Sequence, residues 1–303
     1  MLRQIFLFLS RRRGLRRWME TSRAAARLTS RFVAGQTLAD VLDVSKRLET
    51  AGLLVSLDHL GENVTTLEEA QASRDAMLEA LGEIARLDLT ASVSIKLTQF
   101  GLDLGDAVCL ANVDAVMRRA AQLGRRVEID MEGSEYTART LAIAEQMHAA
   151  HGCVRAVVQA YLHRTEQDIR RLNEAGIRVR LCKGAYKEPP EAAIQTRAGV
   201  DANYLRLARL LLEDGTDPAF ATHDETMIRG ILDHARAKGW AADRFEFQML
   251  YGVRRDLQQR LAAEGWRMRL YVPYGDAWYP YFMRRIAERP ANALFVFRNL
   301  LRA

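Results

Sequence analysis

The sequence contains few cysteines and no long apolar run. Its 303 residues include three cysteines, an odd number at wide spacing and without a CxxC pair. This usage excludes a disulfide framework and a cysteine-based zinc site, and it is typical of a reducing compartment, so we expect a cytoplasmic protein. No window holds eighteen consecutive apolar residues, which excludes a membrane-spanning helix. The six histidines are scattered along the chain, and we therefore expect no metal site.

Positive charge is concentrated near the N-terminus. Residues 1–31 hold nine arginines and one glutamate, whereas the rest of the chain holds 35 basic and 37 acidic residues. A protein that binds nucleic acid usually spreads its basic residues over a folded face, so we expect no nucleic-acid partner. The apolar residues 5–9 precede a run of arginines, which is typical of an amphipathic helix. We assign residues 1–50 to an N-terminal helical arm, whose apolar side either packs on the protein or makes a peripheral contact with the inner face of a membrane.

From residue 53 onward, short apolar strands alternate with amphipathic helices. The predicted strands are residues 53–58, 92–97, 126–131, 156–162, 178–183, 219–223, 245–250 and 268–272. The predicted helices are residues 66–86, 111–123, 136–150, 165–175, 200–213, 224–238, 254–264 and a last one from about Trp278. Eight such pairs without a Pro- or Gly-rich linker are typical of a (β/α)8 barrel. We therefore predict an α/β protein in which residues 51–303 form one TIM-like barrel domain.

One face of most predicted strands is polar. In residues 126–131, the apolar Val127 and Ile129 alternate with Glu128 and Asp130. In other predicted strands, apolar residues alternate in the same way with Lys96, Gln159, Arg180, Gln248 and Tyr271. In a barrel, one parity meets the helices and the other faces the axis. An interior filled for stability alone is usually packed with branched apolar residues, and buried charges must be paired or bind something. Internal ion pairs explain single residues but not a pattern on six strands, so we predict a functional site at the C-terminal mouth.

The last predicted helix has a stripe of polar residues. Tyr281, Arg284, Arg285 and Glu288 fall at i, i+3, i+4 and i+7, on one side of the helix. Adjacent arginines beside a tyrosine provide donors suited to a carboxylate or a phosphate. A solvated helix face explains the same spacing. Because barrels often bind anions near the loops after strands seven and eight, we favour a binding role.

Seven segments of the chain resemble, in order, the motifs of the proline dehydrogenase family in its short, monofunctional bacterial form. They cover about residues 50–300 and read VSIKL, VEIDME, VVQAYLHR, VRLCKGAYKEP, FATHDE, FEFQML and YVPYG…YFMRR. The resemblance implies a (β/α)8 barrel that binds FAD without a covalent bond and oxidises L-proline to 1-pyrroline-5-carboxylate, the first step of proline catabolism to glutamate. It also implies that electrons pass to a membrane quinone. The aldehyde dehydrogenase domain of the bifunctional form is missing, so we expect a separate pyrroline-5-carboxylate dehydrogenase downstream.

The resemblance also implies how the substrate is held. It assigns to substrate binding Lys96, Tyr271, Arg284, Arg285 and Glu62. The lysine and the two arginines would bind the proline carboxylate, the tyrosine would pack on the substrate ring, and Glu62 would pair with Arg284 as a gate. Among the residues assigned to catalysis, Asp130 would be an acid near Tyr271 and Tyr186 would pack on the substrate ring. Arg180 would lie near flavin N5, where a guanidinium stabilises negative charge on the reduced flavin.

A third group of residues is assigned to the cofactor by the same resemblance. Two of them, Met131 and Gln159, would contact the flavin ring, together with Arg180. Lys183, Gly184 and Ala185 would also lie at the cofactor. The rest of FAD would be held by Thr222, His223, Glu288, Arg289, Pro290 and Ala291. Without the motif, His223 is equally well interpreted as a hydrogen-bonded core histidine.

Two other functions remain open on the residues alone. A Schiff-base aldolase barrel would use Lys96 or Lys183 as its nucleophile. A non-enzymatic protein would bind carboxylates, or nucleic acid through the arginine-rich arm. A yellow, flavin-containing protein would discriminate between these functions and a dehydrogenase.

Overall fold

The described part of the chain is a closed parallel barrel. The computed structural model describes residues 29–61 and 64–288, with side chains through residue 283. The strands pair in chain order and the last closes on the first. They are β1 (Leu54–His59), β2 (Ser92–Ile95), β3 (Val127–Ile129), β4 (Val154–Gln159), β5 (Arg178–Cys182), β6 (Ala219–Ala221), β7 (Glu246–Leu250) and β8 (Met268–Tyr274). The predicted barrel is confirmed, and each predicted strand overlaps an observed one.

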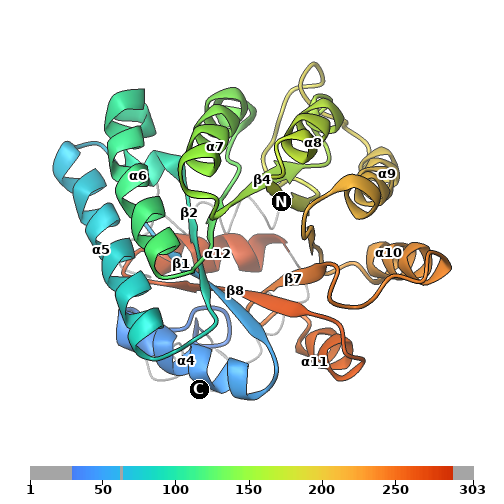
Figure 1. Ribbon diagram of the computed structural model, residues 1–303, viewed down its shortest axis with the longest axis horizontal. Helices are drawn as coiled ribbons and strands as arrows, with labels where there is room; N and C mark the ends of the chain where they lie inside the picture. Colours follow the sequence, from blue (N-terminus) through green and yellow to red (C-terminus); the bar gives the residue numbers. More distant parts are fainter. Residues whose placement is uncertain (1–28, 62–63, 289–303) are drawn as a thin grey trace.

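Helices surround the barrel as a ring (Figure 1). Seven of them follow strands β1 to β7, and they are α5 (Leu67–Arg86), α6 (Asp106–Gln122), α7 (Thr137–His151), α8 (Thr165–Glu174), α9 (Arg197–Asp214), α10 (Glu225–Ala237) and α11 (Arg255–Ala263). Short 3-10 helices lie in the loops after β2 and β3, at η1 (Leu97–Phe100), η2 (Leu102–Leu104) and η3 (Ser134–Tyr136). None of the helices within the described ranges has both the length and the apolar character to span a bilayer.

The eighth place in the ring is filled by a helix that precedes the barrel. This helix, α4 (Leu38–Thr50), packs on β1 and β8 and lies between α11 and α5 (Figure 1). It begins at a capping box in which Thr37 accepts from the Asp40 amide and Asp40 accepts from the Thr37 amide. Residues 38–50, which the sequence pattern groups with the N-terminal arm, thus form part of the barrel shell.

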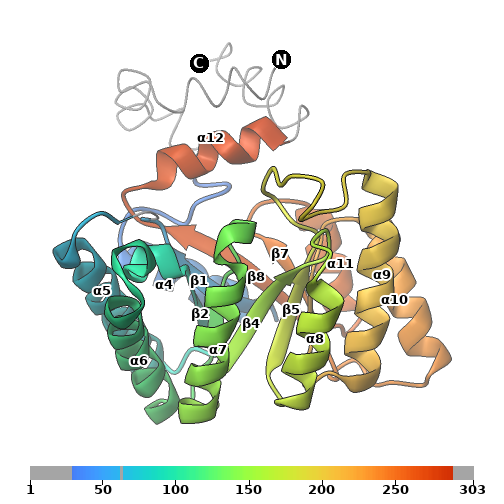
Figure 2. The ribbon, with the colours of Figure 1, turned by 90° about the horizontal axis from the view of Figure 1, so that it is seen from above.

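The helix after β8 lies across the mouth instead of joining the ring. Figure 2 shows α12 (Trp278–Glu288) above the ends of the strands. Pro280 lies in its first turn, where a missing amide hydrogen costs nothing. An apolar cluster separate from the barrel core joins its Trp278 and Phe282 to Phe32 and Val253. The segment before α4 therefore fastens α12 to the barrel.

Side chains alternate between the helix shell and the barrel axis, as predicted. Val127 and Ile129 of β3 are fully buried in the apolar core, whereas Glu128 between them bonds to side chains across the barrel. Between β1 and β2, the hydroxyls of Ser56 and Ser94 lie 2.9 Å apart. The interior is thus lined by polar groups that must find partners inside the barrel.

Candidate active site

Four polar side chains converge at the mouth. Lys96 follows β2, Asp130 follows β3, Arg180 lies in β5 and Tyr271 lies in β8. The Tyr271 hydroxyl donates to Asp130 Oδ2 at 2.6 Å and accepts from Lys96 Nζ at 3.1 Å. Arg180 Nη2 donates to the other oxygen, Asp130 Oδ1. The barrel thus gathers residues that are far apart in the sequence around one carboxylate.

Burial and neighbouring charges fix the protonation states in this cluster. Burial opposes the ionisation of Asp130, but Arg180 and Lys96 outweigh it and hold the pKa of the carboxyl below its ordinary value. Burial, reinforced by the charge of Asp130, raises the pKa of Tyr271 well above that of a free phenol. Burial disfavours the charge of Arg180, but Asp130 and Glu128 outweigh it and raise its pKa. At neutral pH the cluster therefore contains a carboxylate, a neutral phenol and a guanidinium cation.

Asp58 also belongs to this cluster, and sequence reasoning missed it. Its Oδ1 accepts from Lys96 Nζ at 3.1 Å, and its side chain is only 1% exposed. It lies in β1 on the same face as Ser56. The alternation that marks the polar face of the other strands is also present in β1, and applying it there would have identified Asp58.

A cavity of about 930 Å³ opens beside the loops that follow β5 and β6. Its lining includes Tyr186 and five residues assigned to the cofactor, namely Lys183, Gly184, Ala185, Thr222 and His223. Gly184 has a φ of +113°, and a Cβ there would lie 2.3 Å from the ring of Tyr161. Only glycine allows the loop to pass this ring in that conformation. Tyr186 is 44% exposed and stands at the open side.

The polar groups of the cavity are held by neighbours that the sequence pattern did not indicate. Lys183 Nζ donates to Asp224 Oδ2 at 2.9 Å and also to Asp201. His223 Nε2 accepts from the Leu250 amide at 2.9 Å, so a neutral ring has its hydrogen on Nδ1. His223 therefore fits both earlier interpretations, because it is bonded to the backbone and also lines the cavity.

Two further predicted residues lie at the C-terminal ends of β3 and β4. Gln159, at the end of β4, donates from Nε2 to the Glu132 carbonyl at 2.8 Å and is almost fully buried. Met131 is buried and packs with the apolar core. Gln159 lies in β4, between β3 and β5, whereas Met131 directly follows Asp130 after β3.

Several predicted residues cannot be placed as side chains. Glu62, Arg289, Pro290 and Ala291 lie outside the described residues. Arg284, Arg285 and Glu288 lie in α12, for which the backbone is described at these positions. The position of α12 over the mouth brings this part of the chain to the strand ends (Figure 2).

The donor set of the cavity fits a phosphate-bearing cofactor such as FAD. Thr196, the neutral N-cap residue of α9, lines it. Helix N-termini present amide hydrogens to anions. Lys183, Arg197 and Arg254 add cationic groups to the lining. Within the described ranges, no group of three or more His, Cys, Asp or Glu side chains is arranged to hold a metal ion.

Known proteins share both the sequence and the fold. The sequence profile of the family described as Proline dehydrogenase matches residues 41–298. Proline dehydrogenase 1 of Bacillus subtilis is 41% identical over 304 residues, which cover 100% of both chains. The proline dehydrogenase of Deinococcus radiodurans is 38% identical, covering 91% of this chain and 90% of the relative.

A solved structure extends the likeness to three dimensions. It is the crystal structure of proline utilization A (PutA) from Bdellovibrio bacteriovorus inactivated by N-propargylglycine, with a TM-score of 0.82 and 25% identity. The match covers 87% of this chain and 33% of the longer PutA chain. Profile, full-length relatives and fold agree, and the chain belongs to the proline dehydrogenase family.

Proposed function

We propose that this protein is an FAD-dependent dehydrogenase that oxidises L-proline to 1-pyrroline-5-carboxylate, the first step of proline catabolism. The observation that supports it best is the buried cluster of Lys96, Asp130, Arg180 and Tyr271 at the mouth, next to a cavity with a phosphate-binding donor set. Family membership over the full chain agrees with this reaction.

The substrate would be held by its charges and its ring. Lys96 is one cation for the proline carboxylate, and Arg284 and Arg285 on the covering helix would supply two more. Burial opposes the ionisation of Asp130, but Arg180 and Lys96 hold its pKa below the ordinary value. It is therefore a weak base and would orient charge instead of removing a proton. The neutral Tyr271 and Tyr186 would enclose the ring and fix the distance over which hydride moves.

When bound, FAD would supply the acceptor for the hydride that leaves the ring carbon beside the nitrogen. Lys183, Thr222, His223 and the chain from Glu288 to Ala291 would hold its phosphates and adenosine, and Gly184 with Ala185 would let the backbone approach it. Met131 and Gln159 would contact the ring. Arg180 would face its reactive edge and stabilise the negative charge that reduction creates.

The electrons would then pass to a membrane quinone, and the product would go to a separate dehydrogenase. Residues 1–28 concentrate positive charge, which suits a peripheral contact between the arm and an anionic membrane surface on the cytoplasmic side.

Glu62 and Arg284 would form a gate over the bound substrate, which completes the proposed site.

The contacts of the lysines argue against an aldolase. A Schiff-base nucleophile must be a neutral amine. Lys96 lies within 3.4 Å of both Asp58 and Asp130, and two carboxylates stabilise the ammonium form. Lys183 forms ion pairs with Asp201 and Asp224.

An absorbance spectrum of the purified protein tests the proposed function. Oxidised-flavin bands should be present, or appear after reconstitution with FAD, and they should bleach when L-proline is added without oxygen. A colourless protein that takes up no FAD would contradict the flavin. A colourless protein that borohydride traps with a carbonyl substrate would support the aldolase instead.

A further inference from the structure

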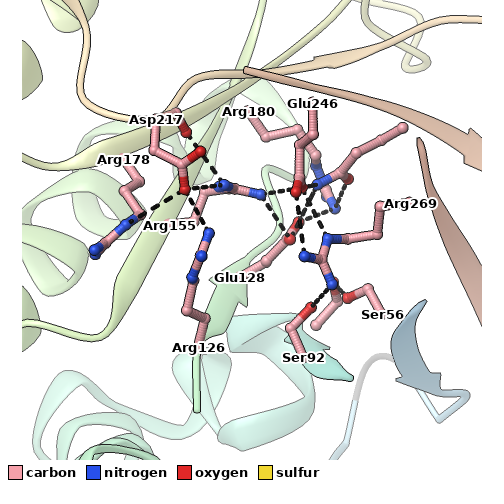
Figure 3. Close-up of polar contacts among 12 residues, drawn as sticks. Ser56, Ser92, Arg126, Glu128, Arg155, Arg178, Arg180, Asp217, Glu246 and Arg269 are labelled. Carbon is pink, nitrogen blue, oxygen red and sulfur yellow. Dashed lines mark hydrogen bonds and ion pairs between the residues drawn. The ribbon is translucent and has the colours of Figure 1, made fainter. Parts of the chain in front are cut away.

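A network of charged side chains fills the barrel below the mouth (Figure 3). Its centre is Glu128 of β3, whose side chain is 1% exposed. This carboxylate accepts from Arg180 Nη1 at 2.6 Å, from Gln248 Nε2 at 3.0 Å and from Arg155 Nη1 at 3.3 Å. Three donors from three different strands therefore hold it in one position.

Arg180 connects this network to the mouth. Its Nη1 donates to Glu128 and to Gln248 Oε1, the latter at 3.2 Å, and its Nη2 donates to Asp130. Glu128 therefore fixes one end of the guanidinium and Asp130 the other. The plane of the guanidinium cannot turn unless one of these bonds breaks.

We propose that Glu128 is a positioning residue that acts on the bound flavin through Arg180. It orients the guanidinium and offsets part of its charge, and it thereby sets how strongly the flavin attracts electrons. The inference rests on the proposed function, in which Arg180 faces the flavin. Glu128 itself lies one side chain deeper, below Asp130 on the same face of β3.

The chemistry of the pocket explains why a carboxylate is needed there. Each group that faces Glu128 is a donor, namely a guanidinium nitrogen of Arg155, one of Arg180 and the amide nitrogen of Gln248. A glutamine at this position would present its own NH2 to one of them. Glu128→Gln should therefore loosen Arg180 and leave its charge less balanced, although its size is unchanged.

Glu246 offers a matched control in the same network. It is fully buried in β7 and is also contacted by Arg155 and Gln248. Its other partners are Arg269 at 2.8 Å and Arg267 at 3.2 Å, whereas Arg180 bonds to Glu128 and Asp130. Glu246→Gln removes the same buried charge without touching the arginine of the mouth.

The experiment measures the two-electron midpoint potential of the flavin in the wild-type holoenzyme and in both variants, by equilibration with a reference dye. Glu128→Gln should shift the reduction equilibrium about tenfold towards the reduced flavin, which is about 30 mV for a two-electron couple. Glu246→Gln should shift it less than threefold. Glu128→Asp, which keeps the charge, should return it to within threefold of the wild type.

The outcomes separate this inference from the function on which it rests. Equal shifts in Glu128→Gln and Glu246→Gln, or no shift in Glu128→Gln, overturn the role of Glu128. The proposed function stands in that case, provided that proline still bleaches the wild-type flavin. A wild-type protein that binds no FAD overturns both. If Glu128→Gln does not fold, the double variant Glu128→Gln, Arg155→Met removes a charge pair together. Because Arg155 also pairs with Asp217 and Glu246, its removal offsets part of the charge effect, so the shift should keep its direction but be smaller than tenfold. A wild-type potential in this variant contradicts the proposal.

Discussion

At the scale of single residues, the site depends on hydroxyl and carboxylate groups that serve more than one partner. The Tyr271 hydroxyl both accepts from Lys96 and donates to Asp130. Because the pKa of this phenol is raised by burial and by Asp130, it remains a donor at neutral pH. The tyrosine therefore holds the cation and the anion of the mouth at a fixed separation.

Tyr271→Phe removes this hydroxyl and keeps the ring. It leaves buried polar partners without a bond, at a cost of about 1–3 kcal/mol, so kcat/KM for proline should fall about 5- to 150-fold. Steady-state kinetics and the flavin content check this, and the flavin content should not change. Tyr204→Phe is the control, because this buried tyrosine of α9 donates to the Leu181 carbonyl and not to the mouth. If both variants lose activity equally, Tyr271 has no special part in the site.

Some residues of the site could be predicted from the sequence and others could not. Asp130, Arg180 and Tyr271 follow from the alternation along their strands, because that alternation is local. Their exact partners are not local, and Arg155 lies one residue before the strand that the apolar pattern marks. Asp217, in a loop with a φ of +43°, forms ion pairs with Arg126, Arg155 and Arg178 (Figure 3). It also pairs with Arg267, and no pattern in the sequence predicts these contacts.

At the scale of elements, the loop after β5 shapes the cavity. Gly184 passes the ring of Tyr161 at a distance that leaves no room for a side chain. Gly184→Ala should therefore displace the loop and lower the amount of flavin that the protein retains, together with its thermal midpoint. The control is Gly176→Ala, at a φ of +68° in open space, which should cost only the backbone strain of about 1–2 kcal/mol. Full flavin retention in Gly184→Ala would show that the loop does not hold the cofactor.

The order of strands and helices was predictable, but the place of two helices was not. Strands of period two and helices of period 3.6 differ in local pattern, so the eight pairs could be read from residue 53 onward. Both α4 and α12 have one apolar side, and the pattern does not tell which of them packs on the sheet. That choice depends on the fit against β1 and β8, which is a property of the closed barrel.

At the scale of the whole molecule, the buried charges make the free energy of unfolding depend on pH. Burial opposes the ionisation of Glu246, but Arg269 and Arg155 outweigh it and hold its pKa well below the ordinary value. A carboxyl with a depressed pKa stabilises the folded state above its unfolded pKa of about 4.3. This contribution is lost as the pH falls from there towards the folded pKa, because the unfolded chain then binds more protons.

Glu246→Gln should reveal this dependence. At pH 7 it breaks a buried ion pair and should lower the free energy of unfolding by about 3–5 kcal/mol. Between about pH 5 and pH 3 the difference from the wild type should narrow, because Glu246 binds a proton in the unfolded wild type there but stays ionised in the folded protein, so the wild type loses stability. Urea unfolding at several pH values measures it, with Asp233→Asn on the exposed side of α10 as a control that changes little. A difference that stays constant down to pH 3 would contradict the depressed pKa.

The closure of the helix ring by α4 has a consequence for how such a protein diverges. Because α4 occupies the place beside β1 and β8, folding of the barrel does not require α12 to seal the sheet. The helix over the mouth can therefore accumulate substitutions under selection for the ligand it covers, while the foldability of the barrel is conserved. Changes in α12 should therefore alter ligand preference at a smaller cost in barrel stability than changes in the strands that line the mouth.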